Sequence, residues 1–260
     1  MSETTSTQTI DCGGRDAVVE VVGSGHDVVL VGAAAPMAWT RPTARSLSRL
    51  GCRVVNFDYG FGHPNPEPRT AIRQIDDVVA VMEALQLRRA TVVGVSRGGI
   101  TAFGLASAHP QRVTSLALVF AVAAFPDTLM VGNPDLRPEP GESDDDFMHR
   151  SLKSVFSERF LEQDPDIAVS LMTTPPGAVA RVNRDQEMTF DEDARVTCPT
   201  LVIEGGADEV VTTEHAQRFM RAIPEAEHVR IPDAPHGWPM ERPNLLAGLI
   251  ADFARSSDDW

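Results

Sequence analysis

Lysine is almost missing from this sequence, in which Lys153 is the only one. Arginine supplies the rest of the 23 basic residues, against 37 acidic ones, and the formal net charge is -14. A surface of that sign repels phosphate backbones and anionic membranes, so we expect neither nucleic acid nor a membrane as a partner. The scarcity of lysine, with many Ala, Gly, Pro and Asp residues, points to a GC-rich bacterial genome.

Cysteines and long apolar runs are also scarce. Cys12, Cys52 and Cys198 are widely spaced and form neither a metal-ligand pattern nor a disulfide framework, so we expect no metal and no cofactor. No run of about 18 apolar residues occurs, and the polar segment 1–9 lacks the apolar stretch of a signal peptide. These absences predict a cytoplasmic protein with no membrane span.

Short β-branched runs alternate with longer amphipathic segments along most of the chain, which predicts a mostly parallel sheet with helices on both faces. We expect strands at 17–22, 27–31, 53–57, 90–95, 113–119, 200–204 and 228–231. We expect helices at 42–50, 70–85, 98–108, 215–222 and 245–253, with Thr40 as the candidate N-cap of the first. The fold class is therefore α/β.

The segment 125–195 breaks this alternation. It is rich in Pro, Asp, Glu and Met, and its apolar residues fit short helices, such as 146–156 and 167–172, rather than strands. About seventy residues without strands are too many for a loop in a compact domain. We expect a helical cap insertion here, placed as a lid over an active site, between core segments 1–124 and 196–260.

The strongest chemical signal is the turn Gly94-Val95-Ser96-Arg97-Gly98. An apolar strand enters this turn and a helix of small residues leaves it, and the two glycines remove Cβ atoms where strand and helix converge. A serine placed there lies at a helix N-terminus, where N–H groups favour developing negative charge. Ser96 is thus a candidate nucleophile, and a serine that only caps the helix is the alternative.

A nucleophilic serine needs a base, and the base needs a third group that fixes its tautomer. After a serine in this kind of turn, the acid comes first along the chain and the histidine second. Asp208 follows the predicted strand 200–204, and His236 follows the strand 228–231. Glu209 is the nearest alternative acid, ahead of Glu204 and Asp233.

The other histidines are expected to be structural. Their positions are in loops, at helix ends, within a strand or, for His149 and His215, on solvated helix faces; the full set is His26, His63, His109, His149, His215 and His228.

Taken together, these pieces resemble the α/β-hydrolase family. The matching segments are 28–34, 58–62, 94–98, 199–208 and 236–243, together with Trp39, and the likeness covers nearly all of the chain outside 125–195. The resemblance implies an eight-stranded sheet with an inserted helical lid. It also implies that Ser96, Asp208 and His236 form a catalytic triad.

The resemblance further implies an oxyanion hole made of backbone N–H groups. One belongs to Arg97, and the other lies in the loop 32–35, where Ala34 is the first choice and Ala33 the second. Relatives often carry His-Gly at this loop, where this chain has Gly32 and three alanines. A backbone donor needs no particular side chain, so the hole can survive that difference.

Three further side chains are candidates for the pocket. Relatives often have an uncharged residue at the position of Arg97, whose guanidinium either recognises an anionic substrate group or pairs with an acidic neighbour such as Asp58. Trp39 and Trp238 flank the oxyanion loop and the base. They are candidate pocket walls, with burial in the core as the alternative.

Three functions fit these residues, each with a small molecule as the partner. The first is hydrolysis of a carboxylic ester, thioester or lactone through an acyl-enzyme. The second uses the same triad for C–C bond hydrolysis, acyl transfer or cyclisation in a biosynthetic pathway, because a fold does not decide among these. The third is a ligand-binding protein with little turnover. Epoxide-hydrolase and dehalogenase chemistry is disfavoured because it uses Asp where this chain has Ser96. The sequence leaves the oligomeric state open.

Overall fold

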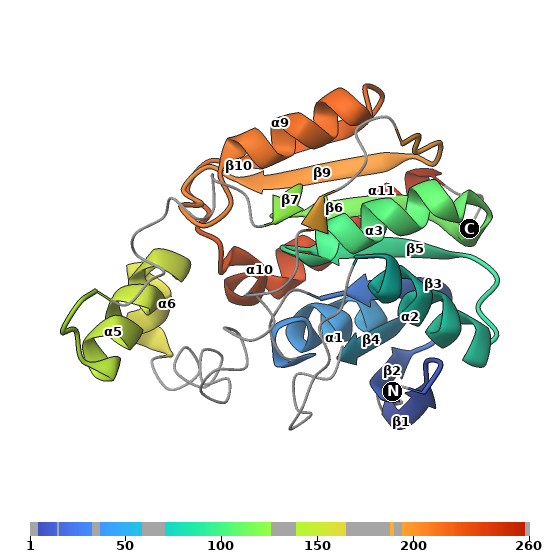
Figure 1. The fold of residues 1–260 in the computed structure, drawn as a ribbon, viewed down its shortest axis with the longest axis horizontal. Helices are drawn as coiled ribbons and strands as arrows, with labels where there is room; N and C mark the ends of the chain where they lie inside the picture. Colours follow the sequence, from blue (N-terminus) through green and yellow to red (C-terminus); the bar gives the residue numbers. More distant parts are fainter. Residues whose placement is uncertain are drawn as a thin grey trace.

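A computed structural model of the chain describes residues 5–14, 16–32, 37–58, 71–125, 139–164, 188–189 and 194–257. Its centre is an eight-stranded sheet in the order β1-β2-β4-β3-β5-β6-β9-β10 (Figure 1). The strands are β1 Thr5–Asp11, β2 Asp16–Gly23, β3 His26–Val31, β4 Cys52–Asp58, β5 Ala90–Val95, β6 Val113–Val119, β9 Thr200–Gly205 and β10 Glu227–Ile231. The pairings of β2 with β1 and with β4 are antiparallel and the other five are parallel, so the predicted mostly parallel sheet is confirmed.

Helices cover both faces of this sheet (Figure 1). On one face α2, α3 and α9 enclose an apolar core, and on the other face α1 and α11 enclose a second one. The helices are α1 Arg41–Arg49, α2 Ala71–Ala84, α3 Gly98–Ala108, α9 Thr213–Ala222, the short α10 Trp238–Glu241, α11 Pro243–Ser257 and the 3-10 turns Met37–Trp39 and Pro110–Arg112. Central strands buried on both sides are rich in Val, Leu and Ile, which is why sequence reasoning found them.

Strand β1 was not predicted from the sequence. Its residues are mostly Thr, Ser and Gln, so it lacks the apolar alternation by which a half-buried strand is recognised. It nevertheless pairs with β2 from Thr5 opposite Val22 to Asp11 opposite Asp16. The turn between them contains Gly13 at φ 70° and Gly14 at φ 84°, and the Gly14 N–H donates to Asp11 Oδ1 at 2.6 Å. The residues of this turn therefore give a signal for the hairpin, whereas the apolar pattern of β1 gives none.

Thr40 stands at the predicted N-cap position of α1, but its hydroxyl does not cap the helix. The Thr40 Oγ1 atom lies instead 2.6 Å from Asn56 Oδ1 and 3.1 Å from the Met37 carbonyl oxygen. Asn56 is fully buried in β4. These contacts fix the end of the segment that connects β3 to α1.

The segment 125–195 contains helices α5 Asp144–Val155 and α6 Glu158–Gln163, drawn beyond α10 in Figure 1. The predicted helix 146–156 corresponds to α5, and the predicted helix 167–172 lies outside the described residues. The expectation that the segment contains no strands is wrong. β7 Ala124–Phe125 pairs antiparallel with β8 Met188–Thr189, and two-residue strands are too short to show any period.

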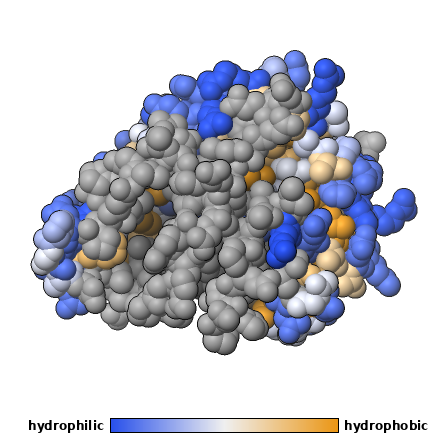
Figure 2. All heavy atoms as spheres, in the orientation of Figure 1, coloured by the Kyte–Doolittle hydropathy of each residue, from blue (hydrophilic) through white to orange (hydrophobic). Residues whose placement is uncertain are grey.

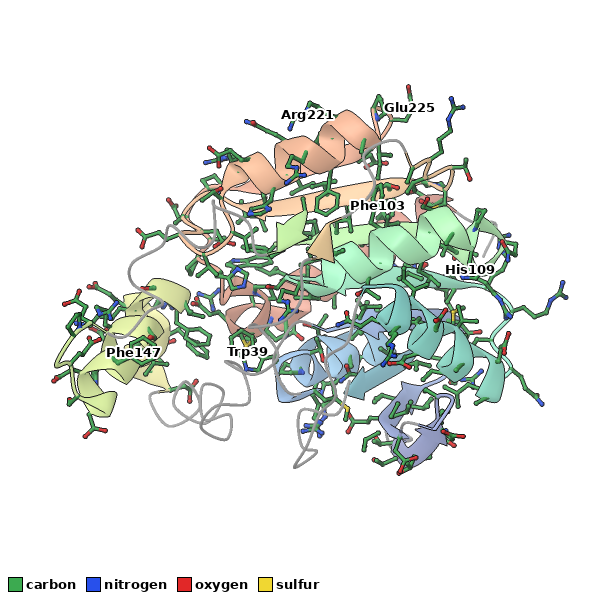
Figure 3. All side chains as sticks on the ribbon, viewed as in Figure 1. Trp39, Phe103, His109, Phe147, Arg221 and Glu225 are labelled. Atoms are coloured by element: carbon green, nitrogen blue, oxygen red, sulfur yellow. The ribbon has the colours of Figure 1, made fainter. Side chains whose placement is uncertain are left out.

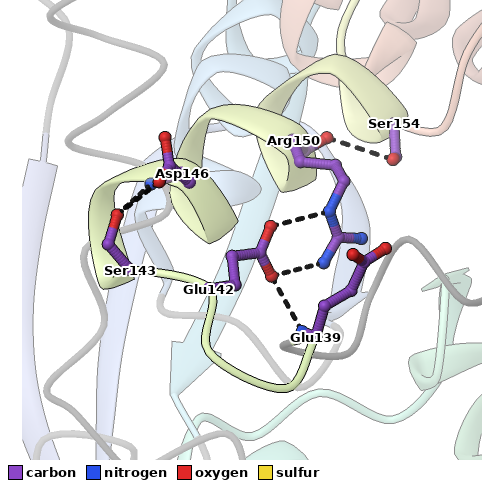
Figure 4. A network of polar contacts seen from close by, with 6 residues as sticks. All are labelled: Glu139, Glu142, Ser143, Asp146, Arg150 and Ser154. Atoms are coloured by element: carbon purple, nitrogen blue, oxygen red, sulfur yellow. Dashed lines mark hydrogen bonds and ion pairs between the residues drawn. The ribbon is translucent and has the colours of Figure 1, made fainter.

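Helix α5 begins in a polar network (Figure 4). Ser143 Oγ accepts from the Asp146 N–H at 3.2 Å and donates to the Asp146 carboxylate at 2.7 Å. Arg150 donates from Nε and Nη2 to the two carboxylate oxygens of Glu142, at 2.9 and 2.7 Å. The Arg150 hydrogen bonds hold the pKa of Glu142 below its ordinary value. The N-terminus of α5 is thus specified by its own side chains.

Few large apolar side chains are exposed in the part of the chain that the structure describes. In Figure 2 hydrophilic residues predominate over α9, at the top of the view, as the net charge of -14 leads one to expect. Among the described residues, the exposed large apolar side chains are Val18, Leu50 and Leu245. Within the same residues, no helix is long and apolar enough to cross a membrane.

Candidate active site

Ser96 occupies a sharp turn between β5 and α3, with φ at 52°. That left-handed conformation is costly for a residue with a side chain, and it persists only where the surroundings impose it. Strand and helix approach so closely that a Cβ on Gly94 would lie 2.6 Å from Ala102 Cβ, and a Cβ on Gly98 would overlap the Val31 carbonyl oxygen. The two glycines of the motif therefore meet the steric demand that the sequence predicted.

Backbone hydrogen bonds hold the turn from both sides. The Ser96 N–H donates to the Val119 carbonyl at 3.0 Å, and the Ser96 carbonyl accepts from the N–H groups of Val122 and Gly99, each at 2.9 Å. Val119 ends β6, and Val122 follows it on the way into the insertion. The neighbouring strand thus fixes the nucleophile turn.

The structure brings the predicted serine, histidine and aspartate together from separate loops. Ser96 Oγ lies 3.2 Å from His236 Nε2, and His236 Nδ1 lies 2.9 Å from Asp208 Oδ2. Ser96 and His236 are each 7% exposed, and the Asp208 side chain is fully buried. In this order a histidine can accept the serine proton while the carboxylate retains the Nδ1 proton and stabilises the imidazolium.

Asp208 is held in place by the loop that carries it. Its Oδ1 atom accepts from the N–H groups of Val210 and Val211, at 2.9 and 2.8 Å, which leaves Oδ2 for His236. Hydrogen bonds of this kind to a charged acceptor are about twice as strong as neutral ones. The carboxylate is therefore oriented before any substrate binds.

The alternative acids point elsewhere. Glu209 and Asp233 are exposed. Glu204 is buried, and its carboxylate accepts hydrogen bonds from Thr213 Oγ1 at 2.5 Å and from Arg230 Nη1 at 3.1 Å. Of these carboxylates, the structure places Asp208 on the histidine.

Phe120 is a site residue that sequence reasoning missed. It follows β6 with φ at 48°, and its ring lies edge-on to the His236 ring at 6.4 Å between centroids. The same ring stacks on Trp238 at 6.0 Å. Its position directly after a central strand was the only available signal, and a phenylalanine there is ordinarily core.

The expectation for His215 is wrong. Instead of facing solvent on α9 it is fully buried, and its Nδ1 atom accepts from the Ala123 N–H at 3.1 Å. His215 lies four residues before the buried Phe219, so the two share the face of α9 that packs on the sheet. His149 is exposed as predicted, and His63 lies outside the described residues.

The second half of the predicted oxyanion hole, Ala33 and Ala34, also lies outside the described residues. Arg97 follows the serine and is 7% exposed, and burial lowers the pKa of its guanidinium to about 10. The side chain of Asp58, its predicted acidic neighbour, is outside the described residues. Both readings of Arg97 therefore stay predictions.

The two tryptophans have different surroundings. Trp238 is 9% exposed and packs in the core beneath the histidine, against Phe120. Trp39 is half-buried and lies beside the insertion, with its ring 6.4 Å from that of Phe156 (Figure 3). Contact of either ring with a substrate stays a prediction. Within the described part of the chain, no group of three or more His, Cys, Asp or Glu residues is arranged to hold a metal ion.

Comparison with known proteins identifies the family of the chain. The model of the alpha/beta hydrolase family matches residues 21–249. The chain is 26% identical over 214 residues to 3-oxoadipate enol-lactonase 1 of Acinetobacter baylyi, which spans 78% of this chain and 79% of that protein. It is 25% identical over 264 residues to 2-hydroxymuconate semialdehyde hydrolase of Pseudomonas putida, spanning 91% and 89%.

Among solved structures, the meta-cleavage product hydrolase of Pseudomonas fluorescens shares the fold, with a TM-score of 0.81 at 19% identity. That likeness covers 96% of this chain and 98% of the other. From the match over residues 21–249 and the hydrolases among its relatives, the chain belongs to the alpha/beta hydrolase family and is an enzyme of the hydrolase type.

Proposed function

We propose that the protein hydrolyses a carboxylic ester, thioester or lactone of a small molecule through an acyl-enzyme on Ser96. The observation that carries this proposal is the contact chain from Ser96 Oγ through His236 to Asp208, at 3.2 and 2.9 Å, beneath a strained serine turn. A serine that merely caps α3 would not require an oriented histidine and carboxylate behind it.

In the proposed reaction His236 Nε2 takes the proton of Ser96 as its Oγ attacks the carbonyl carbon. The imidazolium, stabilised by Asp208, then protonates the leaving oxygen or sulfur, and the acyl group stays on the serine. A water that gives its proton to His236 next attacks the acyl-enzyme, and the imidazolium returns this proton to Ser96 Oγ as the acid leaves. In each step the backbone N–H of Arg97, with that of Ala34 or Ala33, is proposed to hold the oxyanion.

The proposed substrate is small, and the segment 125–195 is proposed to form a lid over it. Support for a lactone or ester comes from the 26% identity to an enol-lactonase over 78% of the chain. The second candidate is hydrolysis of a C–C bond with the same residues. It is favoured by the relative from Pseudomonas putida, whose named substrate is a semialdehyde rather than an ester or a lactone.

The test compares wild type with Ser96→Ala on short p-nitrophenyl esters, a lactone series and a fluorophosphonate probe. We expect ester or lactone turnover and covalent labelling, and both should be lost with Ser96→Ala. Labelling of Ser96 with no ester, thioester or lactone turnover would shift the proposal to the second candidate. If neither turnover nor labelling depends on Ser96, the acyl-enzyme proposal fails and a ligand-binding role gains.

A further inference from the structure

Among the described residues, a short segment of the insertion is hydrogen-bonded to the residues that follow the candidate base. We call residues 155–157, from the last residue of α5 to the N-cap of α6, the elbow, and residues 234–241, which include His236 and the short helix α10, the base loop. The N–H of Gly237, the residue after His236, donates to the Val155 carbonyl at 2.6 Å. The backbone of the base loop is therefore hydrogen-bonded to the insertion directly beside the histidine.

A carboxylate of the base loop makes the second link. Glu241 Oε1 accepts from the Ser157 N–H at 2.7 Å, and Glu241 Oε2 accepts from the Ser157 hydroxyl at 2.7 Å. Ser157 is also the N-cap of α6, because its Oγ accepts from the Phe160 N–H at 3.3 Å. Two short bonds to one charged group fix both position and angle, which a single neutral bond would not do.

The contact is also sterically close. A Cβ on Gly237 would lie 2.7 Å from the Val155 carbonyl oxygen and would overlap the Phe156 ring. Phe156 in turn stacks on Phe160 at 5.1 Å between centroids. The elbow therefore sits against the base loop with no space for even one methyl group.

The elbow also packs on the supports of the other two site residues. Its apolar side chains belong to one buried cluster that includes Val122, Val210 and Val211. The N–H of Val122 bonds the Ser96 carbonyl, and the N–H groups of Val210 and Val211 bond Asp208. Displacement of the elbow would consequently shift the supports of Ser96, Asp208 and His236.

We infer that Glu241 is a positioning residue for His236, acting through Ser157 and the elbow. The inference rests on the proposed function, because it assigns His236 the role of base. Without the carboxylate, Ser157 loses both hydrogen bonds to Glu241, and the segments are held by the Gly237–Val155 hydrogen bond and by apolar packing. Reaction rates are sensitive to such a change, since a misplacement of about 1 Å can cost on the order of a hundredfold.

The test uses Glu241→Ala, Glu241→Gln and Ser157→Ala in the full chain. The amide of Gln can accept from the Ser157 N–H and donate to its hydroxyl, so Glu241→Gln should keep most of the wild-type rate. Ser157→Ala keeps the bond from its N–H and should be intermediate. For Glu241→Ala we expect the rate of fluorophosphonate labelling of Ser96 to fall at least about tenfold. Glu225→Ala, at an exposed carboxylate after α9 (Figure 3), is the matched control.

Two readouts separate positioning from simple loss of stability. With a turned-over substrate, Glu241→Ala should lower kcat while KM stays within about threefold, because the change displaces the base rather than the substrate. By proton NMR, the downfield Nδ1–H resonance of the His236–Asp208 hydrogen bond should broaden in Glu241→Ala and persist in Glu241→Gln. Both comparisons are made well below each variant's unfolding temperature.

Labelling of Glu241→Ala at the wild-type rate, with an unchanged downfield resonance, would overturn the inference. An equal loss in Glu241→Gln would also overturn it, since charge rather than position would then matter. If Glu241→Ala does not fold, Ser157→Ala decides, and a wild-type rate and resonance in that variant would refute positioning. If wild type shows no Ser96-dependent labelling, the proposed function fails, while the NMR comparison still tests whether Glu241 orients His236.

Discussion

Substituting Gly237 by alanine is expected to destabilise the protein by displacing the elbow. The backbone of Gly237 has φ -76° and ψ -2°, a right-handed conformation that alanine adopts freely. In the absence of a clash, alanine would therefore stabilise the folded protein by about 0.4–1 kcal/mol, because it restricts the conformations of the unfolded chain. Against this, its Cβ would lie 2.7 Å from the Val155 carbonyl oxygen, where carbon contacts ordinarily begin near 3.5 Å.

The Val155 oxygen belongs to the backbone, so relief requires the whole elbow to move. Overpacking of this kind costs about 1–3 kcal/mol. Set against the gain for alanine, the free energy of unfolding should fall by about 1–2 kcal/mol. For a chain of this size that corresponds to a Tm lower by roughly 2–8 °C.

Thermal and denaturant unfolding of Gly237→Ala measure the fall in Tm and in the free energy of unfolding, with Gly248→Ala as the matched control. Gly248 lies in α11, and a Cβ there meets nothing within 4 Å, so alanine should stabilise by up to about 1 kcal/mol. Equal stability of Gly237→Ala and wild type, or a gain in stability for both variants, would refute the reasoning about the elbow.

Three further predictions concern buried and paired groups. His215→Leu leaves the buried Ala123 N–H without its acceptor and should lower the free energy of unfolding by about 1–3 kcal/mol in urea melts, whereas an unchanged midpoint would contradict that contact. Burial raises the pKa of Cys52 to about 11, so at pH 9 its thiol should alkylate at least about tenfold more slowly in the native protein than after unfolding; equal rates would refute its burial. The lowered pKa of Glu142 contributes stability above its unfolded value of 4.5, and this is lost as pH falls through the folded value. Wild type should thus lose more stability than Arg150→Gln from about pH 5 to about pH 3, and parallel losses would exclude the pair.

The parts of the fold that sequence reasoning found are those whose signal is local. Strands β5, β6 and β9 are apolar runs buried on both faces, and the serine turn carries its glycines within five residues. Asp208 follows β9 and His236 follows the edge strand β10, and both were identified because they come after the serine in the order that the family uses. These signals require no knowledge of contacts between distant segments.

The parts that it missed depend on contacts between distant segments. Glu241 and Ser157 are 84 residues apart, and the sequence around neither residue indicates a contact with the other. His215 was misplaced because its polarity was weighed above its spacing to Phe219 on the buried face of α9. Phe120 is a site residue because its ring contacts that of His236, which is distant in the sequence.

The joint between elbow and base loop has a consequence for engineering this family by domain exchange. Insertions are attractive modules to exchange between proteins, because each begins after one core strand and ends before the next. Here residues 155–157 supply hydrogen-bond partners to Gly237 and Glu241, so they belong to the core machinery even though they lie within the inserted segment. A chimera that replaces them together with the rest of 125–195 would exchange part of the support of the base. The exchangeable unit should leave the elbow and its two flanking helices with the host.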